Sequence, residues 1–113
     1  MNRPTRFYSS KQEKKVAKVL GGKTVSNSGA PAFVAGDVTL NDWLIECKTT
    51  TATSKASFSI KKEWLEKNKE EAFAVRKQHS ALAFRFGADE EDYYIISEKE
   101  FKNYLELLGQ IQS

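Results

Sequence analysis

The sequence contains only one cysteine and one histidine among its 113 residues. A single cysteine cannot form an intrachain disulfide, and a zinc site built from Cys and His needs more such ligands than one chain offers here. No apolar run approaches the roughly 18 residues of a membrane span, and the N-terminal segment MNRPTRFYSS lacks the apolar stretch of a secretory signal. We therefore expect a soluble protein of a reducing cytoplasm, with no membrane association.

Charge is abundant and unevenly distributed. Residues 1–62 carry 11 Lys and Arg against 4 Asp and Glu, whereas residues 63–113 carry 7 against 11, which together give the net charge of +3. A positive field on one side suits a polyanion such as nucleic acid. A solvated, lysine-rich helix surface would produce the same count, so both interpretations remain open.

The length fits a single domain spanning residues 1–113. Hydrophobic periodicity and turn residues predict an α/β (α+β) chain in the order α-β-β-β-α-β-β-α, with a mixed β-sheet flanked by helices. The first and last helices are each predicted to start at a Ser-x-x-Glu capping box, at Ser10 and at Ser97. The expected helices cover 10–20, 60–78 and the segment after residue 97, and the expected strands cover 24–25, 33–40, 43–48, 81–86 and 93–96.

The strand WLIECK, residues 43–48, interrupts its apolar character with Glu46 and Lys48. Alternation places both side chains on one face of the strand. If Asn41 and Asp42 form a two-residue turn, Asp37 lies directly opposite Glu46 in an antiparallel hairpin. Opposed carboxylates repel unless a cation lies between them, although a slip of one residue in the register would turn Asp37 to the other face.

This cluster has the composition of a metal-dependent phosphodiesterase. Carboxylate oxygens of Asp37 and Glu46 suit Mg²⁺ or Mn²⁺ and leave room for a substrate phosphate. Lys48 could activate a water or offset negative charge in the transition state. An ordinary surface hairpin with a Glu/Lys pair is the alternative interpretation.

Asp37 followed by Glu46-Cys47-Lys48 at the end of an apolar strand resembles the PD-(D/E)XK nuclease signature, with Gly36 in place of the signature proline. Within that superfamily the chain is most similar to small archaeal-type and phage Holliday junction resolvases. The similarity covers most of the chain, including the helix-one glutamate Glu13, the loop 26–29, the run 45–49 and the strand LAFRF at 82–86.

The resemblance implies a restriction-endonuclease-like fold and assigns roles to individual residues. Asp37, Glu46 and the main-chain carbonyl of Cys47 would bind the metal, Glu13 would reach it directly or through water, and Lys48 would be catalytic. The capping box is the alternative role for Glu13. Contacts to DNA are expected from basic and hydroxyl side chains near the site and in the N-terminal segment: Arg3, Arg6, Lys11, Ser26, Ser28 and Lys55, with Phe7 and Tyr8 beside the two arginines.

The function that the resemblance implies is an endonuclease that requires Mg²⁺ or Mn²⁺ and resolves four-way DNA junctions by paired symmetric nicks, without a small-molecule cofactor. Two nicks require two sites, and hence a homodimer, whose interface would come from the acidic half, or from helix 60–78 and strand 81–86. A bacterial or archaeal cell, or a phage that infects one, would be the source. The alternatives are a nicking, flap or restriction-type nuclease on the same fold and a non-catalytic nucleic-acid-binding module.

Overall fold

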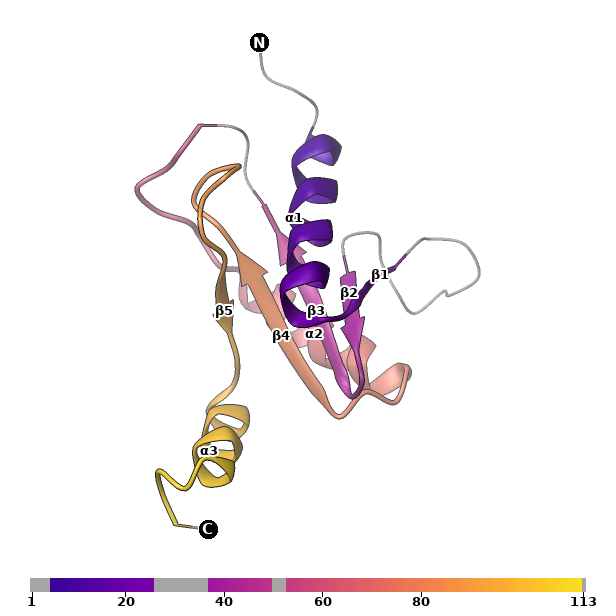
Figure 1. Cartoon of the computed structure of the whole chain (residues 1–113), viewed down its shortest axis with the longest axis vertical. Coiled ribbons are helices and arrows are strands. Elements are labelled where there is room, and N and C mark those ends of the chain that lie inside the picture. The colour runs from indigo at the N-terminus through magenta and orange to yellow at the C-terminus, as the bar shows by residue number, and fades with distance from the viewer. Residues whose placement is uncertain (1–4, 26–36, 50–52, 113) are drawn as a thin grey trace.

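The computed structural model describes residues 5–25, 37–49 and 53–112, which form one mixed β-sheet with helices packed on it (Figure 1). This confirms the predicted mixed α+β architecture. None of the described helices is long and apolar enough to cross a membrane. The elements, in chain order, are α1 (Thr5–Leu20), β1 (Lys23–Thr24), β2 (Asp37–Leu40), β3 (Trp43–Lys48), α2 (Lys62–Ala74), β4 (His79–Phe84), β5 (Tyr93–Ile95) and α3 (Glu98–Leu107).

The five strands are arranged in their sequence order, and every neighbouring pair is antiparallel except β3 and β4. That parallel pair is joined by α2, since parallel strands need a crossover connection. Asn41 adopts a positive φ of 39°, as the first residue of a tight hairpin turn can. Asp37 therefore pairs with Glu46 and Leu40 with Trp43, which confirms the predicted register.

The two faces of the sheet are covered by different helices, with α1 in front and α2 behind in Figure 1. Val16 and Ala17 of α1 pack on the face that includes Ile45, Cys47 and Ala83. Alternation turns Leu44, Glu46 and Lys48 to the other face, over which α2 lies. Leu44 and Leu82 are fully buried there. Glu46 and Lys48 of β3 therefore lie on the face of the sheet that α2 covers.

Several predicted boundaries are wrong. Helix α1 begins at Thr5 and places Ser10 and Glu13 inside the helix, so they form no capping box at its start. Tyr8 is buried and belongs to the core, which contradicts its expected contact with nucleic acid. The predicted helix 60–78 is shorter, and β4 begins at 79 because the His79 amide donates to the carbonyl of Asp42. The cap of α3 is confirmed, since Ser97 accepts a hydrogen bond from the amide of Glu100.

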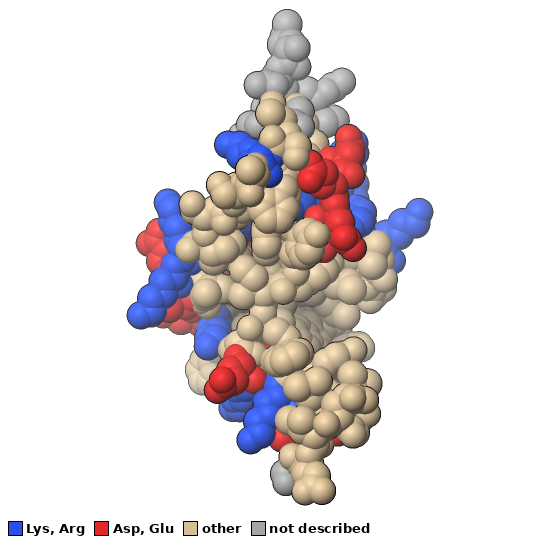
Figure 2. Space-filling model, turned by 90° about the vertical axis from the view of Figure 1, so that its left-hand side faces the viewer, with Lys and Arg blue, Asp and Glu red and all other residues tan. Residues whose placement is uncertain are grey.

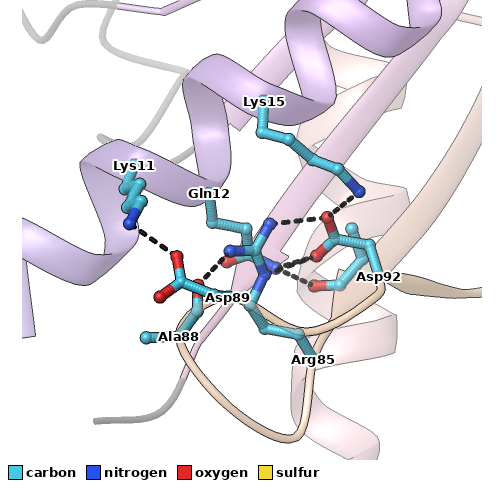
Figure 3. A network of polar contacts seen from close by, with 8 residues as sticks. Lys11, Gln12, Lys15, Arg85, Ala88, Asp89 and Asp92 are labelled. Carbon is cyan, nitrogen blue, oxygen red and sulfur yellow. Dashed lines mark hydrogen bonds and ion pairs between the residues drawn. The ribbon is translucent and has the colours of Figure 1, made fainter. Parts of the chain in front are cut away.

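A buried polar network joins α1 to the connection between β4 and β5 (Figure 3). Arg85 donates to both carboxylate oxygens of Asp92, over 2.9 and 2.7 Å, and to the carbonyl of Ala88. From α1, Gln12 donates to Asp92 over 2.9 Å and Lys15 pairs with it at the same distance. Asp92 is therefore satisfied from both sides, and the network fixes α1 against the far edge of the sheet.

Gly22 sits where α1 turns into β1, directly against β2. A Cβ at this position would lie 2.6 Å from the carbonyl oxygen of Thr39 and 3.1 Å from the side chain of Val38. We therefore expect Gly22→Ala to lower the free energy of unfolding by about 1–3 kcal/mol, because backbone atoms must move to relieve the overlap. Urea unfolding with an unchanged m-value measures this loss. A midpoint equal to that of the wild type would contradict it.

Candidate metal centre

Three carboxylates from three elements meet on the α2 side of the sheet. Asp37 opens β2, Glu46 lies near the end of β3, and Glu71 comes from the last turns of α2. Each offers an oxygen, and these atoms all lie within 4.8 Å of one another. Asp37 is fully buried, and the side chain of Glu71 is only 11% exposed. Such a group is unstable without a proton or a cation to compensate its charge.

Glu71 shows this strain most directly. Burial and the charge of Glu46 raise the pKa of Glu71 above its usual value, while Lys67, a side-chain hydrogen bond with Asp37 and Lys48 lower it less. The Lys67 ammonium is 3.8 Å from Oε1, at the long end of an ion pair. The other oxygen, Oε2, is buried and receives no hydrogen bond from any part of the chain that the structure describes. A hard divalent cation between the three carboxylates would use the oxygen that no donor now reaches.

Lys48 borders the carboxylates and is held from two sides. Its ammonium lies 3.0 Å from Oε2 of Glu46 and 4.5 Å from the ring centroid of Trp64, in the first turns of α2. Lys61 approaches the same ring at 5.8 Å. The Trp64 ring and the Glu46 carboxylate together hold the Lys48 ammonium beside the carboxylate group. A cation that bound Glu46 would compete with Lys48 for that carboxylate.

The site opens into a pocket of about 670 Å³ between the end of β3 and the start of α2. The pocket is acidic, because five carboxylates and two lysines line it among the residues that the structure describes. The acidic residues are Asp37, Glu46, Glu63, Glu66 and Glu70, and the lysines are Lys48 and Lys67. A phosphate would be repelled from this pocket unless a bound cation first reduced its negative charge.

Cys47 contributes no reactive thiol. Its side chain is buried in the core under α1, and burial raises the pKa of the thiol far above its usual value, with the charges of Glu13, Asp92 and Asp37 adding to the effect. The thiolate required for nucleophilic chemistry is therefore suppressed. The implied role of Cys47 is through its main-chain carbonyl, and Cys47 does line the pocket.

Glu13, the fourth expected ligand, lies on α1 and is 4% exposed. Its charge acts on the Cys47 thiol, which faces α1 rather than α2. Among the described residues, the group of acidic side chains able to share one ion consists of Asp37, Glu46 and Glu71 and does not include Glu13. Glu71, which the sequence analysis did not single out, is the third carboxylate of this group.

The expected DNA contacts fall into three groups. Arg3, Ser26 and Ser28 lie outside the described residues, and of Arg6 only the backbone, within α1, is described. Lys11 is paired with Asp89 at 2.5 Å, on the α1 side of the sheet. Lys55 is exposed, and its amide donates to the carbonyl of Phe86. Of the described side chains among them, neither Lys11 nor Lys55 lines the pocket that contains Asp37 and Glu46.

His79, at the start of β4, has a structural environment. Its Nδ1 lies 2.7 Å from Oε2 of Glu100, and its ring stacks on Trp43 at a centroid distance of 4.9 Å. It ties α3 to the sheet at the end opposite the metal centre.

The protein-family models, the curated proteins and the solved structures compared with this chain include no significant match.

Proposed function

We propose that this chain is a divalent-metal-dependent endonuclease that acts on branched DNA. The observation that carries the proposal is the meeting of Asp37, Glu46 and Glu71 within 4.8 Å beside the ammonium of Lys48. Oxygen-only ligands of this kind suit Mg²⁺ or Mn²⁺ better than zinc or copper. The hairpin that brings Asp37 opposite Glu46 also agrees with the PD-(D/E)XK resemblance and its restriction-endonuclease-like fold.

The chain's own residues would divide the work in a simple way. Asp37, Glu46 and Glu71 would hold the cation, which supplies Lewis acidity toward a phosphate oxygen. Lys48, released from Glu46 when that carboxylate binds the ion, would stabilise negative charge that develops on the phosphate. Trp64 would keep the Lys48 amine within reach of the pocket, since the ring lies on one side of it. The pocket floor, formed by the sheet, would limit the approach of water to one side.

A non-catalytic nucleic-acid-binding module is the weaker candidate. Such a module would present basic side chains at its binding pocket, whereas carboxylates outnumber lysines in this one. Its binding would also be indifferent to Mg²⁺ and to Asp37→Asn. The preference for four-way junctions, and the homodimer that two paired nicks require, are parts of the proposal that rest on the resemblance.

The proposed activity is tested with a labelled four-way junction, a matched linear duplex and a flap, each with Mg²⁺ or EDTA. We expect paired nicks in the junction, lost with EDTA, and a loss of about 10²–10³-fold in the cleavage rate of Asp37→Asn, the scale of removing one key electrostatic group. Lys48→Ala should lower the cleavage rate while it retains metal binding.

The matched control is Glu63→Gln, which removes a carboxylate from the pocket rim without touching the three-carboxylate group. Equal cutting of all three substrates would reject junction specificity and keep the nuclease. Absence of cutting at any divalent ion concentration, with DNA binding unchanged in Asp37→Asn, would reject the catalytic proposal and favour the binding module.

A further inference from the structure

Helix α3 carries an apolar stripe that the described chain leaves uncovered. Phe101 and Tyr104 are each slightly more than half exposed, Leu107 is 87% exposed and Leu108 is 53% exposed, and no residue of α3 is buried. The helix has ten residues, fewer than the 12–15 at which an isolated helix becomes even marginally stable in water. Its stability therefore requires packing that the described part of this chain does not provide.

The first turn of α3 is nevertheless tied to the sheet. Glu100 is tied to His79 over 2.7 Å, and Ser97 caps the first turn. In Figure 1, α3 lies at the lower end of the molecule, beyond the strands of the sheet. A helix that is anchored at its start and uncovered along its apolar face projects from the surface. We call the exposed apolar residues of α3 and of the segment after it (Phe101, Tyr104, Leu107, Leu108 and Ile111) the α3 ridge.

An apolar groove of about 430 Å³ lies directly beside this ridge, on the α1 face of the sheet. Leu20, Trp43, Ile45 and Ile96 are among its lining residues, and Tyr104 of α3 forms one of its walls. Ridge and groove thus adjoin on one surface. Figure 2 views the molecule from the left-hand side of Figure 1, so that the α1 face is seen edge-on. In the lower part, where α3 lies, the surface toward α1 is mostly uncharged, and charged side chains lie on the other side.

We propose that the α3 ridge and the adjoining groove form a two-fold interface with a second copy of this chain, in which the end of each α3 enters the groove of the other copy. A two-fold contact uses the same patch on both partners, so the patch must contain both the protruding and the receiving shape. This patch does. Glu100, which pairs with His79, is the one charged residue among the described residues that line the groove, and a patch with no basic side chain suits an apolar protein surface and does not suit a nucleic acid.

The size of the patch also matches a second copy. Phe101, Tyr104, Leu107, Leu108 and Ile111 are all 40% exposed or more. If each contributes on the order of 100 Å², two copies would bury about 1,000 Å² of apolar surface, which reaches the lower limit of a specific interface before polar atoms are counted. Of the predicted interface locations, strand 81–86 is less suitable, because Ala81, Leu82 and Ala83 are buried, whereas α3 lies within the acidic half.

Sedimentation equilibrium over a wide range of chain concentrations tests the interface, independently of any nuclease activity. We expect a mass of twice the 12.8 kDa chain, and at least about 30-fold weaker association in Tyr104→Glu, the size of a central interface residue's contribution. Asn103→Glu adds the same charge to the adjacent, exposed position of α3 and should leave the mass unchanged. Phe73→Glu, on the exposed face of α2, is the second control.

A second readout locates the groove. In a Trp64→Phe background, emission reports Trp43 alone, and we expect it to shift to shorter wavelength as the chain associates. Circular dichroism verifies that Tyr104→Glu remains folded. A wild-type chain that stays monomeric at every concentration would overturn the proposal and leave the patch to a partner of different sequence. A dimer that persists unchanged in folded Tyr104→Glu would overturn it as well.

Discussion

Glu71→Gln should weaken Mg²⁺ binding by at least about 10–100-fold, the loss that even an outer supporting residue of a metal site causes, and should at the same time stabilise the metal-free protein at neutral pH. The two effects have one cause. The substitution replaces a charged carboxylate ligand with a neutral amide, which binds Mg²⁺ more weakly, and it also removes a buried negative charge that faces Glu46. The expected gain in the free energy of unfolding without metal is on the order of 1 kcal/mol, a typical single-residue effect.

The pH dependence follows from the raised pKa of Glu71. The folded chain holds this proton more tightly than the unfolded chain, so the destabilisation is absent below the unfolded-state pKa and develops as pH rises through the folded-state pKa. Metal-free wild type should thus lose stability toward neutral pH relative to Glu71→Gln. Because a metal ion replaces this proton, the affinity for Mg²⁺ should rise over the same range.

Thermal unfolding with and without Mg²⁺ measures both effects. For the wild type, Mg²⁺ at 100 times its dissociation constant adds about 2.7 kcal/mol of stability, whereas Glu71→Gln, with 10–100-fold weaker binding, should gain only about 0.4–1.4 kcal/mol at that concentration. Glu70→Gln is the matched control, since it removes the same charge from the neighbouring, exposed position of α2, which lines the pocket but does not belong to the three-carboxylate group. An equal response of Glu70→Gln and Glu71→Gln would show a diffuse field effect and reject the three-carboxylate ion site.

Arg85→Ala should lower the free energy of unfolding by about 3–5 kcal/mol, because it leaves the buried charge of Asp92 without its main partner. Both side chains are nearly inaccessible, at 3% and 1% exposure. That loss is a large part of the 5–15 kcal/mol that stabilises a typical domain. Urea unfolding measures it, and Lys11→Ala, which breaks the exposed pair with Asp89, should change the midpoint only slightly.

Low pH should also lower the free energy of unfolding through Asp92. Burial by itself would raise the pKa of Asp92, but hydrogen bonds from Arg85, Lys15 and Gln12 hold it below its usual value. The stability that this carboxylate contributes is present above its unfolded-state pKa and is lost as pH falls through the folded-state pKa. The wild type should therefore lose more stability in acid than Arg85→Ala does. Parallel curves for the two proteins would contradict the assigned role of Asp92.

The hairpin was the most predictable part of the site because its determinants are local. Turn residues at 41 and 42 and the alternation of β3 fix the register, and the register alone brings Asp37 opposite Glu46. The start of α1 was not predictable in this way, because the Ser10 capping box is a sequence pattern that also occurs inside a helix. Burial of Tyr8 against the rest of the core, a tertiary effect, extends the helix toward the N-terminus.

Glu71 could not be placed from local pattern, since its position depends on how the crossover helix rotates against the sheet. A signal was nevertheless present. The predicted inward face of this helix contained Asn68 and Ala72, and Glu71 lies between them in sequence, one helical turn after Asn68. Glu71 is a charged residue next to the buried positions of its helix, just as Glu46 is a charged residue within the mostly apolar strand β3. Two such anomalies on elements that pack together would have predicted the third carboxylate.

The parallel pairing of β3 with β4 gives the carboxylate cluster an order of assembly. Asp37 and Glu46 are nine residues apart and can meet as soon as the β2–β3 hairpin closes, a local event. Glu71 joins them only after α2 has crossed the sheet and Trp43 has paired with His79, a contact between distant parts of the chain. A nascent chain would thus carry an incomplete, weak ion site until this late step, and bound ion would retard unfolding more than it would accelerate folding.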